Sequence, residues 1–229
     1  MKSNRINESE KGGTGMRIWI YGAPFSGKTT FASQFKGAKI LSTDGNAEYL
    51  FPKEDIYRIK SYADLDKAVQ EIKKNPPETL VIDTTEYLLD YIKFNWYAKN
   101  KVSHESEIAF KGYSMLRTEM WEQLFSLANI CDNTIFISHE GVFIEKNKFG
   151  REITHFEPQF ESAIKDKMHG LMTIVMRAVI VPDEKVGNQY KLHIHHTDEE
   201  FGGTRLPIKE TEIDNDVEAF RNNFVKKGE

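Results

Sequence analysis

Apolar and polar positions follow two different periods in the first 140 residues. Short β-rich apolar runs predict strands at 17–21, 38–42, 56–59, 79–83 and 134–138. Apolar positions at helical spacing predict helices at 28–35, 61–74, 85–98 and 113–130. Strands that alternate with helices are typical of an α/β fold, in which helices flank a mostly parallel sheet.

The pattern changes after residue 140. Two pairs of β-rich runs around turn residues predict hairpins, at 141–145 with 152–156 and at 171–181 with 189–196. A short helix is predicted at 158–168 and a closing helix at 213–224. We therefore expect a flexible leader at 1–15 and a single domain at 16–229. Its core spans 16–140, and its C-terminal extension of antiparallel strands and closing helix spans 141–229.

Composition narrows the possible environments of this chain. No apolar run approaches the roughly 20 residues of a membrane helix, so we expect no membrane contact. A single cysteine suits a reducing compartment and favours a cytoplasmic protein. The net charge of -4 is unlike a dedicated duplex-binding module, so any nucleic-acid contact needs a local basic strip or a surface built by several subunits.

The stretch YGAPFSGKTTF carries the clearest chemistry. Gly22, Gly27, Lys28 and Thr29 fit G-x-x-x-x-G-K-[ST] between a predicted strand and a predicted helix, the context of a phosphate-binding loop. The backbone N–H groups would surround the phosphates, Lys28 would reach the β- and γ-phosphates, and Thr29 would ligate Mg²⁺. The nucleotide, ATP, would contact the whole loop: Gly22, Ala23, Pro24, Phe25, Ser26, Gly27, Lys28, Thr29 and Thr30.

Asp83 ends the apolar strand at 79–83, about fifty residues after the loop. A buried strand that ends in a carboxylate can hold the Mg²⁺ of the nucleotide through water. We therefore expect Asp83 to lie beside Thr29 and to complete the metal site.

Hydrolysis also needs a group that orients the attacking water. Asp44 follows the second strand, and Glu86 lies three residues after Asp83. As alternatives, Asp44 is a turn residue and Glu86 an acid favoured by the helix dipole. Glu48 is a weaker candidate.

His139 lies at the end of the strand at 134–138, which we expect to neighbour the Asp83 strand. There it could sense the γ-phosphate, or it could be an ordinary surface histidine. His193 and His195 share one face of a predicted strand, and His196 follows. Because no cysteine or carboxylate is evident at ligand spacing, we interpret these three as strand-face residues rather than a metal cluster.

Several segments together resemble one family. GAPFSGKT, LSTDGNAEYL, LVIDTTEYL, TIFISHE and the late GGTRLP are similar to RecA-like P-loop ATPases of phages of Gram-positive bacteria, known as phage nucleotide-binding proteins or AAA-type ATPases. The resemblance covers residues 17–220. It implies a RecA-like core and a role in phage DNA recombination or replication, beside a single-strand annealing or binding protein.

The resemblance also changes the weighting of the site residues. In RecA-like enzymes the catalytic carboxylate follows the second strand, which places Asp44 level with Glu86. RecA-like sites lie between subunits, with a basic residue donated in trans, and Arg205 matches that late position best. Lys165 and Lys167 are alternatives, and a solvated loop charge is an equal alternative for Arg205.

Aromatic and basic residues alternate at 93–101. Bases can stack on aromatic rings while lysines meet phosphates, but the same aromatics have the helical spacing of a core. The sequence therefore predicts a Mg²⁺-dependent ATPase that assembles as a homo-oligomeric ring or filament on single-stranded DNA. The alternatives are a small nucleoside or nucleotide kinase, which would need a lid rich in arginines, and a nucleotide-binding scaffold without turnover.

Overall fold

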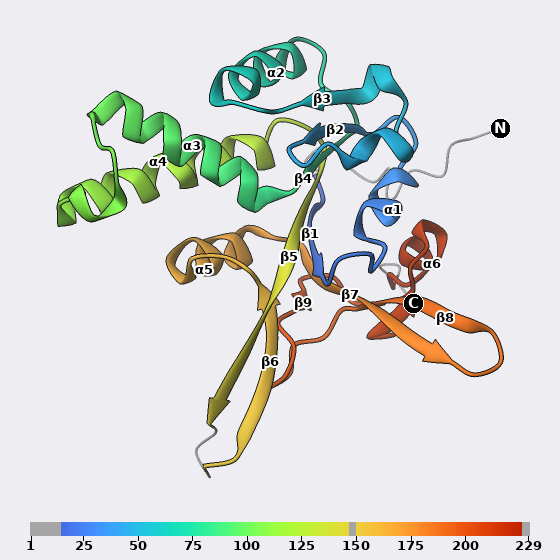
Figure 1. The fold of residues 1–229 in the computed structure, drawn as a ribbon. Coiled ribbons are helices and arrows are strands. Elements are labelled where there is room, and N and C mark those ends of the chain that lie inside the picture. Colours follow the sequence, from blue (N-terminus) through green and yellow to red (C-terminus); the bar gives the residue numbers. More distant parts are fainter. Residues whose placement is uncertain (1–14, 147–149, 226–229) are drawn as a thin grey trace.

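A computed structural model describes residues 15–146 and 150–225. The predicted leader lies outside the described residues, apart from Gly15. The described chain forms a mostly parallel sheet with helices on both faces and antiparallel strands added at its C-terminal side (Figure 1). The expected α/β fold class is confirmed.

The sheet has ten strands among the described residues. Its main path has the order β10-β8-β7-β1-β5-β4-β2-β3, while β6 pairs with β5 and β9 pairs with β7. The strands are β1 (Arg17–Gly22), β2 (Lys39–Ser42), β3 (Ile56–Arg58), β4 (Thr79–Asp83), β5 (Asn133–Lys146), β6 (Glu152–Pro158), β7 (Ile174–Asp183), β8 (Gly187–His193), β9 (Gly203–Thr204) and β10 (Glu212–Asp214).

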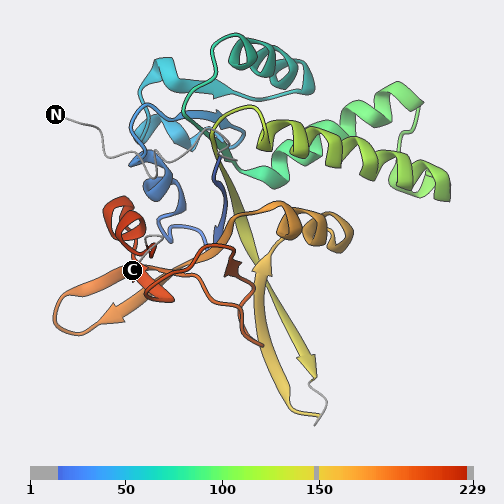
Figure 2. The same ribbon diagram turned by 180° about the vertical axis from the view of Figure 1, so that it is seen from behind.

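Two hydrophobic clusters cover the two faces of the sheet. The helices are α1 (Lys28–Ser33), α2 (Tyr62–Lys74), α3 (Thr85–Asn100), α4 (Phe110–Ala128), α5 (Ser162–Leu171) and α6 (Val217–Asn222). Residues of α2, α3, α4 and α5 pack on one face, and residues of α1 and α6 pack on the other. The separation of the two groups of helices can be followed from both sides in Figures 1 and 2.

Alternation within the central strands explains this division. Trp19 and Tyr21 of β1 enter the cluster under α2–α5, whereas Ile18 and Ile20 enter the cluster under α1 and α6. Successive side chains of a strand point to opposite faces, so a strand that is apolar at every position must be covered twice.

Strand β5 is longer than the sequence pattern indicates. We expected separate strands at 134–138 and 141–145, but β5 runs without a break from Asn133 to Lys146. Its first half lies between β1 and β4, and its second half pairs antiparallel with β6. This β5–β6 hairpin projects away from the sheet (Figures 1 and 2).

Several predicted boundaries are wrong. They include the starts of three helices and the start of β7, which begins at Ile174 rather than 171 because α5 continues to Leu171. The closing helix begins at Val217 rather than 213, because Glu212–Asp214 pairs with β8 and Asp216 caps the helix by accepting from two backbone N–H groups. Helix α4 begins at Phe110 rather than 113, which shortens the preceding loop. Helix α5 spans Ser162–Leu171 rather than 158–168, because β6 continues to Pro158.

Among the residues described, no helix combines the length and apolar content that crossing a membrane requires.

Candidate nucleotide-binding site

The predicted phosphate loop joins the end of β1 to the start of α1. Gly27 caps α1 with a left-handed conformation (φ 88°), which glycine adopts without a steric penalty. No side chain caps the helix there, so its first-turn N–H groups are free of the usual side-chain acceptor. Phe25 also has a positive φ of 65° and is 91% exposed at the crest of the loop. The segment therefore has the backbone of an anion cradle, with an aromatic ring presented to the outside.

Lys28 lies inside this cradle. Its Nζ donates to the carbonyl oxygens of Gly22 at 2.8 Å and Ala23 at 2.7 Å. Burial lowers the pKa of Lys28, and the nearby carboxylates of Asp83, Glu140 and Glu86 oppose this effect. Ser26 is buried in the same loop, and its Oγ has no hydrogen-bond partner among the described residues. A phosphate group would supply acceptors for such donors, so the loop fits the nucleotide expected from its sequence.

Thr29 and Asp83 lie side by side, as the sequence predicts. The Oγ1 of Thr29 donates to Oδ2 of Asp83 at 2.7 Å, which joins the start of α1 to the end of β4. Burial raises the pKa of Asp83 to about 6, against the Thr29 hydrogen bond, and the charge of Asp44 raises it further. A hydroxyl and a carboxylate are oxygen ligands of the kind that Mg²⁺ prefers, so the two residues fit the predicted metal site.

Glu86 lies in the first turn of α3, and its side chain is directed toward His139 in the middle of β5. Its Oε1 accepts from the backbone N–H of His139 at 2.7 Å, and its buried Oε2 has no hydrogen-bond partner in the described part of the chain. Burial raises the pKa of Glu86 to about 8, with a further contribution from the charge of Asp83. A buried carboxyl group of perturbed pKa beside a phosphate loop is typical of a functional acid or base.

Asp44 occupies the rim of the same site. It follows β2, is exposed, and accepts from the backbone N–H of Asn46 at 3.0 Å and from the Asn46 side chain at 2.8 Å. Its charge still raises the pKa of Asp83. Glu48, the weaker candidate, forms an ion pair with Arg58. The structure thus brings both leading carboxylates to one edge of the sheet, Glu86 inside and Asp44 outside.

His139 lies where the strand order places it. Because β5 runs between β1 and β4, its middle part, which contains His139, falls between the phosphate loop and Asp83. Burial lowers the pKa of His139, as does the charge of Lys28. The expected neighbourhood of the two strands is confirmed, and the role of His139 as a sensor stays a prediction.

The C-terminal extension also contacts the phosphate loop, which the sequence did not indicate. Asn215 Nδ2 donates to the carbonyl oxygens of Gly27 at 3.2 Å and Ser26 at 3.4 Å. Gln34, the C-cap residue of α1, donates to the Asn215 carbonyl oxygen and accepts from the N–H of Val217. No short-range pattern could reveal a contact between residues almost 190 positions apart.

A second polar cluster borders the nucleotide site. Arg177 of β7 lies next to Tyr21 in the register of the sheet, and its guanidinium binds Glu140 Oε2 at 3.0 Å and Glu200 Oε1 at 2.5 Å. Despite burial, hydrogen bonds and charges from His193 and Arg177 lower the pKa of Glu200 to about 2. The negative charge of Glu140 in turn raises the pKa of Lys28. This arginine had no predicted role, because its two partners come from separate segments that are distant in the sequence.

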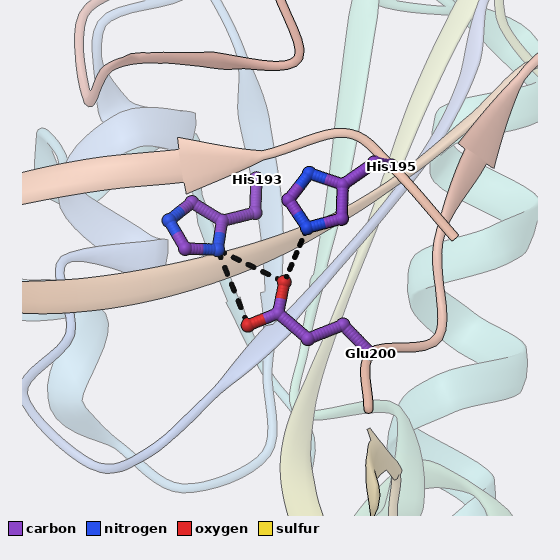
Figure 3. A group of neighbouring side chains, drawn as sticks. All are labelled: His193, His195 and Glu200. Carbon is purple, nitrogen blue, oxygen red and sulfur yellow. Dashed lines mark hydrogen bonds and ion pairs between the residues drawn. The ribbon is translucent and has the colours of Figure 1, made fainter. Parts of the chain in front are cut away.

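The histidines have a carboxylate partner after all. Glu200 lies against both His193 and His195 (Figure 3), although no carboxylate is evident at ligand spacing along the sequence. A turn at Thr197, whose Oγ1 accepts from the Glu200 N–H, reverses the chain and brings Glu200 back. His196 is turned elsewhere, with its ring 6.4 Å from that of His169. The interpretation of His193 and His195 as strand-face residues assumed that no carboxylate lies near them. That assumption is wrong.

Arg205 lies at the opposite edge of the sheet from the phosphate loop of its own chain. It follows β9, which pairs with the first residues of β7, while Gly22 pairs with Ala178 farther along β7. Its guanidinium donates to the carbonyl oxygens of Met172 at 2.9 Å and Gly170 at 2.6 Å, at the end of α5. Within one chain it cannot reach the nucleotide, so the predicted contribution in trans stays a prediction.

The alternative cations are engaged locally. Lys165 is buried, forms an ion pair with Glu157 and lies 5.6 Å from the Phe201 ring centre, while Lys167 lies 5.7 Å from the Trp121 ring centre.

The basic and aromatic segment at 93–101 belongs mainly to the helix pair α3–α4. Trp96 is buried in the core, Lys93 pairs with Glu105 at 3.2 Å, and Lys99 pairs with Glu119 at 3.6 Å. Phe94 is exposed. The core explanation of the aromatic spacing is thus confirmed for Trp96, and the two lysines already face carboxylates.

Comparison with solved structures gave distant likenesses. A KaiC-like protein of Pyrococcus horikoshii OT3 has 14% identity and a TM-score of 0.46, and the match covers 86% of each chain. The flagellar accessory protein FlaH of Methanocaldococcus jannaschii has 8% identity and a TM-score of 0.41 over 79% of this chain and 78% of that chain. An ATPase from the type III secretion system of pathogenic bacteria has 11% identity and a TM-score of 0.43 over 72% of this chain and 51% of that chain. A comparison with curated proteins found no match.

A family model gives a stronger result. The model described as an AAA domain matches residues 14–206, which include the phosphate loop, Asp83, Glu86, His139 and the GGTRLP segment as far as Leu206. With this match over most of its length, the chain belongs to the AAA-domain family of P-loop ATPases.

Proposed function

We propose that this protein hydrolyses ATP with Mg²⁺ and couples the reaction to assembly on single-stranded DNA. The observation that carries the proposal is the meeting of four groups at one edge of the sheet. Lys28 and Thr29 of the phosphate loop lie with Asp83, which is hydrogen-bonded to Thr29, and with Glu86, whose charge reaches Lys28. A lysine can bind the phosphates, a hydroxyl with a carboxylate can hold the metal ion, and a second carboxylate can orient the attacking water.

In this proposal Lys28 leaves the carbonyl oxygens of Gly22 and Ala23 and meets the β- and γ-phosphates. Mg²⁺ would be held by Thr29 and, through water, by Asp83, and it would offset charge on the phosphates. Burial raises the pKa values of Asp83 and Glu86. A cation bound beside them would favour their ionised forms, because opposite charges attract.

Glu86 is the proposed water-positioning residue. One of its oxygens is fixed by the His139 N–H, and the other is buried without a partner among the described residues. Asp44, by contrast, already accepts two hydrogen bonds from Asn46. His139, tied through its N–H to Glu86, is proposed to transmit the presence of the γ-phosphate to β5 and its hairpin.

The cellular role rests on the sequence resemblance. We propose that the protein acts in phage DNA recombination or replication, together with a single-strand annealing or binding protein, in the host cytoplasm. The net charge of -4 suits contact with DNA through an assembled surface better than through one subunit. A head-to-tail assembly would bring the Arg205 edge of one subunit toward the phosphate-loop edge of the next, closing into a ring or continuing as a filament.

The test is phosphate release from ATP by the full chain, alone, with single-stranded DNA and with nucleoside monophosphates. We expect Mg²⁺-dependent turnover that single-stranded DNA stimulates, and its loss in Lys28→Ala. Transfer of phosphate to a monophosphate would instead establish a nucleotide kinase. ATP binding without turnover under all three conditions would establish a scaffold.

A further inference from the structure

Three side chains converge beside β8, next to the Arg177 cluster that borders the nucleotide site. His193 Nδ1 lies 2.9 Å from Glu200 Oε2, and His195 Nε2 lies 3.0 Å from the same oxygen. The ligand atoms of the three residues all lie within 4.8 Å of one another. Figure 3 shows both rings turned toward the one carboxylate.

We infer that His193, His195 and Glu200 form a binding site for a divalent transition-metal ion, with Zn²⁺ as the best fit. Two imidazoles and a carboxylate are an established ligand set for zinc. Zinc–ligand bonds of about 2.0–2.1 Å in a tetrahedron place the ligands about 3.3 Å apart. The separations of 2.9 and 3.0 Å from Glu200 differ from this value by a few tenths of an ångström, and the two imidazole nitrogens lie within 4.8 Å of each other.

The backbone holds the ligands in this arrangement. His193 pairs with Arg177 in the β7–β8 ladder, and the N–H of Ile194 donates to the Thr211 carbonyl oxygen at 2.7 Å. His193 and His195 therefore point to the same side, with ring centres 5.3 Å apart. The Thr197 turn fixes Glu200 opposite them.

Neighbouring groups have the character of an outer ligand shell. His193 Nε2 is buried without a hydrogen-bond partner in the described chain, and Glu212 Oε2 lies 3.5 Å from it. Metal-bound histidines usually donate their second ring N–H to a carboxylate, which Glu212 offers. Arg177 holds Glu200 Oε1, so Oε2 remains directed at the histidines.

Charge also favours a dication. Glu140, Glu200 and Glu212 bring three negative charges to this cluster, and Arg177 brings one positive charge. The net charge is therefore two negative units, which one divalent cation would neutralise when the histidines coordinate in their neutral form. The side chains of His193, His195 and Glu200 remain 18%, 30% and 12% exposed, so an ion and a water ligand can enter.

The test is metal titration of the tag-free full chain after removal of metals with a chelator, without nucleotide. Co²⁺ serves as the visible probe, Zn²⁺ competes with it, and elemental analysis gives the stoichiometry. We expect one tightly bound Zn²⁺ per chain, a rise in the unfolding temperature on adding Zn²⁺, and tetrahedral Co²⁺ absorption that Zn²⁺ removes.

Variants assign the site. The double variant His193→Ala/His195→Ala should weaken Zn²⁺ at least about 100-fold, and Glu200→Gln, which keeps the shape of the side chain, about 10-fold or more. His104→Ala, at an exposed histidine distant in sequence, and Asp83→Asn, in the nucleotide site, should bind Zn²⁺ as the parent does.

Circular dichroism checks the fold of each variant, and Glu200→Gln decides the matter if the double variant is unfolded. Binding that is absent in the parent, or unchanged in Glu200→Gln, overturns the inference and leaves the cluster as an ion-pair network. Neither result depends on ATP hydrolysis, so the metal site and the proposed function fail separately.

Discussion

Replacing Glu86 by Gln should stabilise the nucleotide-free protein while it removes activity. Burial raises the pKa of Glu86 from 4.5 to about 8, so near neutral pH the folded chain keeps it protonated while the unfolded chain ionises it. Each pH unit between the unfolded pKa and the working pH costs about 1.4 kcal/mol of folding free energy. At about pH 7 the cost of keeping Glu86 is therefore about 3 kcal/mol.

The amide of Gln does not titrate, so this cost disappears in the variant. Gln can also keep the acceptor that binds the His139 N–H. Its amide nitrogen remains a buried donor near the unpartnered position of Oε2, which costs about 1 kcal/mol. The net gain is about 2–3 kcal/mol near pH 7, or an unfolding temperature higher by about 5–10 °C.

The sign of the pH dependence follows from the raised pKa. The stability associated with Glu86 is fully present below its unfolded pKa of 4.5 and is lost as the pH rises through about 8. The advantage of the variant over the parent should therefore be small near pH 5 and grow by about 3–4 kcal/mol toward pH 8. Above that pH it should level off.

The assay is urea unfolding followed by circular dichroism at several pH values between 5 and 8.5, without nucleotide or Mg²⁺. Glu122→Gln, at an exposed position of α4, is the control and should show no pH-dependent difference from the parent. Phosphate release measured in parallel should fall about 10²- to 10⁴-fold in Glu86→Gln. A stability difference that does not grow with pH would refute the reasoning about burial. A larger loss of turnover in Asp44→Asn than in Glu86→Gln would move the water-positioning role to Asp44.

Four further outcomes are expected. Asp83→Asn should lose Mg²⁺-dependent turnover about 10²-fold or more while ATP binding, measured with a fluorescent analogue, persists. Gly27→Ala should lower the free energy of unfolding, measured in urea, by about 1 kcal/mol or more beyond the effect of Gly37→Ala. Both glycines have a positive φ, but of the two only Gly27 would bring its added Cβ close to another group, Asn215 Nδ2 at 2.5 Å. Phe25→Ser should leave the monomer's unfolding unchanged, since the ring is 91% exposed, but shift the ATP-dependent assembly measured by light scattering to higher protein concentration. Arg205→Gln should reduce turnover only under assembling conditions; equal loss in dilute and assembled protein would indicate a purely structural role at the end of α5.

The elements near the phosphate loop could be predicted because their signals are local. The strand, glycine loop and helix at 17–33 and the apolar strand that ends in Asp83 each carry their pattern within a few residues. Errors arose where pairing with a distant strand decided the conformation. Glu212–Asp214 became β10 because β8 offers it a partner, although the same residues fit the start of a helix.

The candidate site divides in the same way. The residue types of the phosphate loop and its spacing to Asp83 predict groups that could bind a phosphate and a metal. The sequence could not rank Asp44 against Glu86. Asp44 is exposed after β2, whereas Glu86 is bonded to the backbone of β5, and both properties depend on the assembled sheet.

By itself, then, the sequence determined the α/β class, the phosphate loop and the carboxylates available to it, since these depend on short spacings and local periods. Only the tertiary structure decided the strand order that puts His139 between Gly22 and Asp83, and the burial that raises the pKa of Glu86. It alone also decided the meeting of Glu200 with His193 and His195. The physical reason is that desolvation and the convergence of charges depend on distances across the folded chain, which no spacing along the sequence specifies.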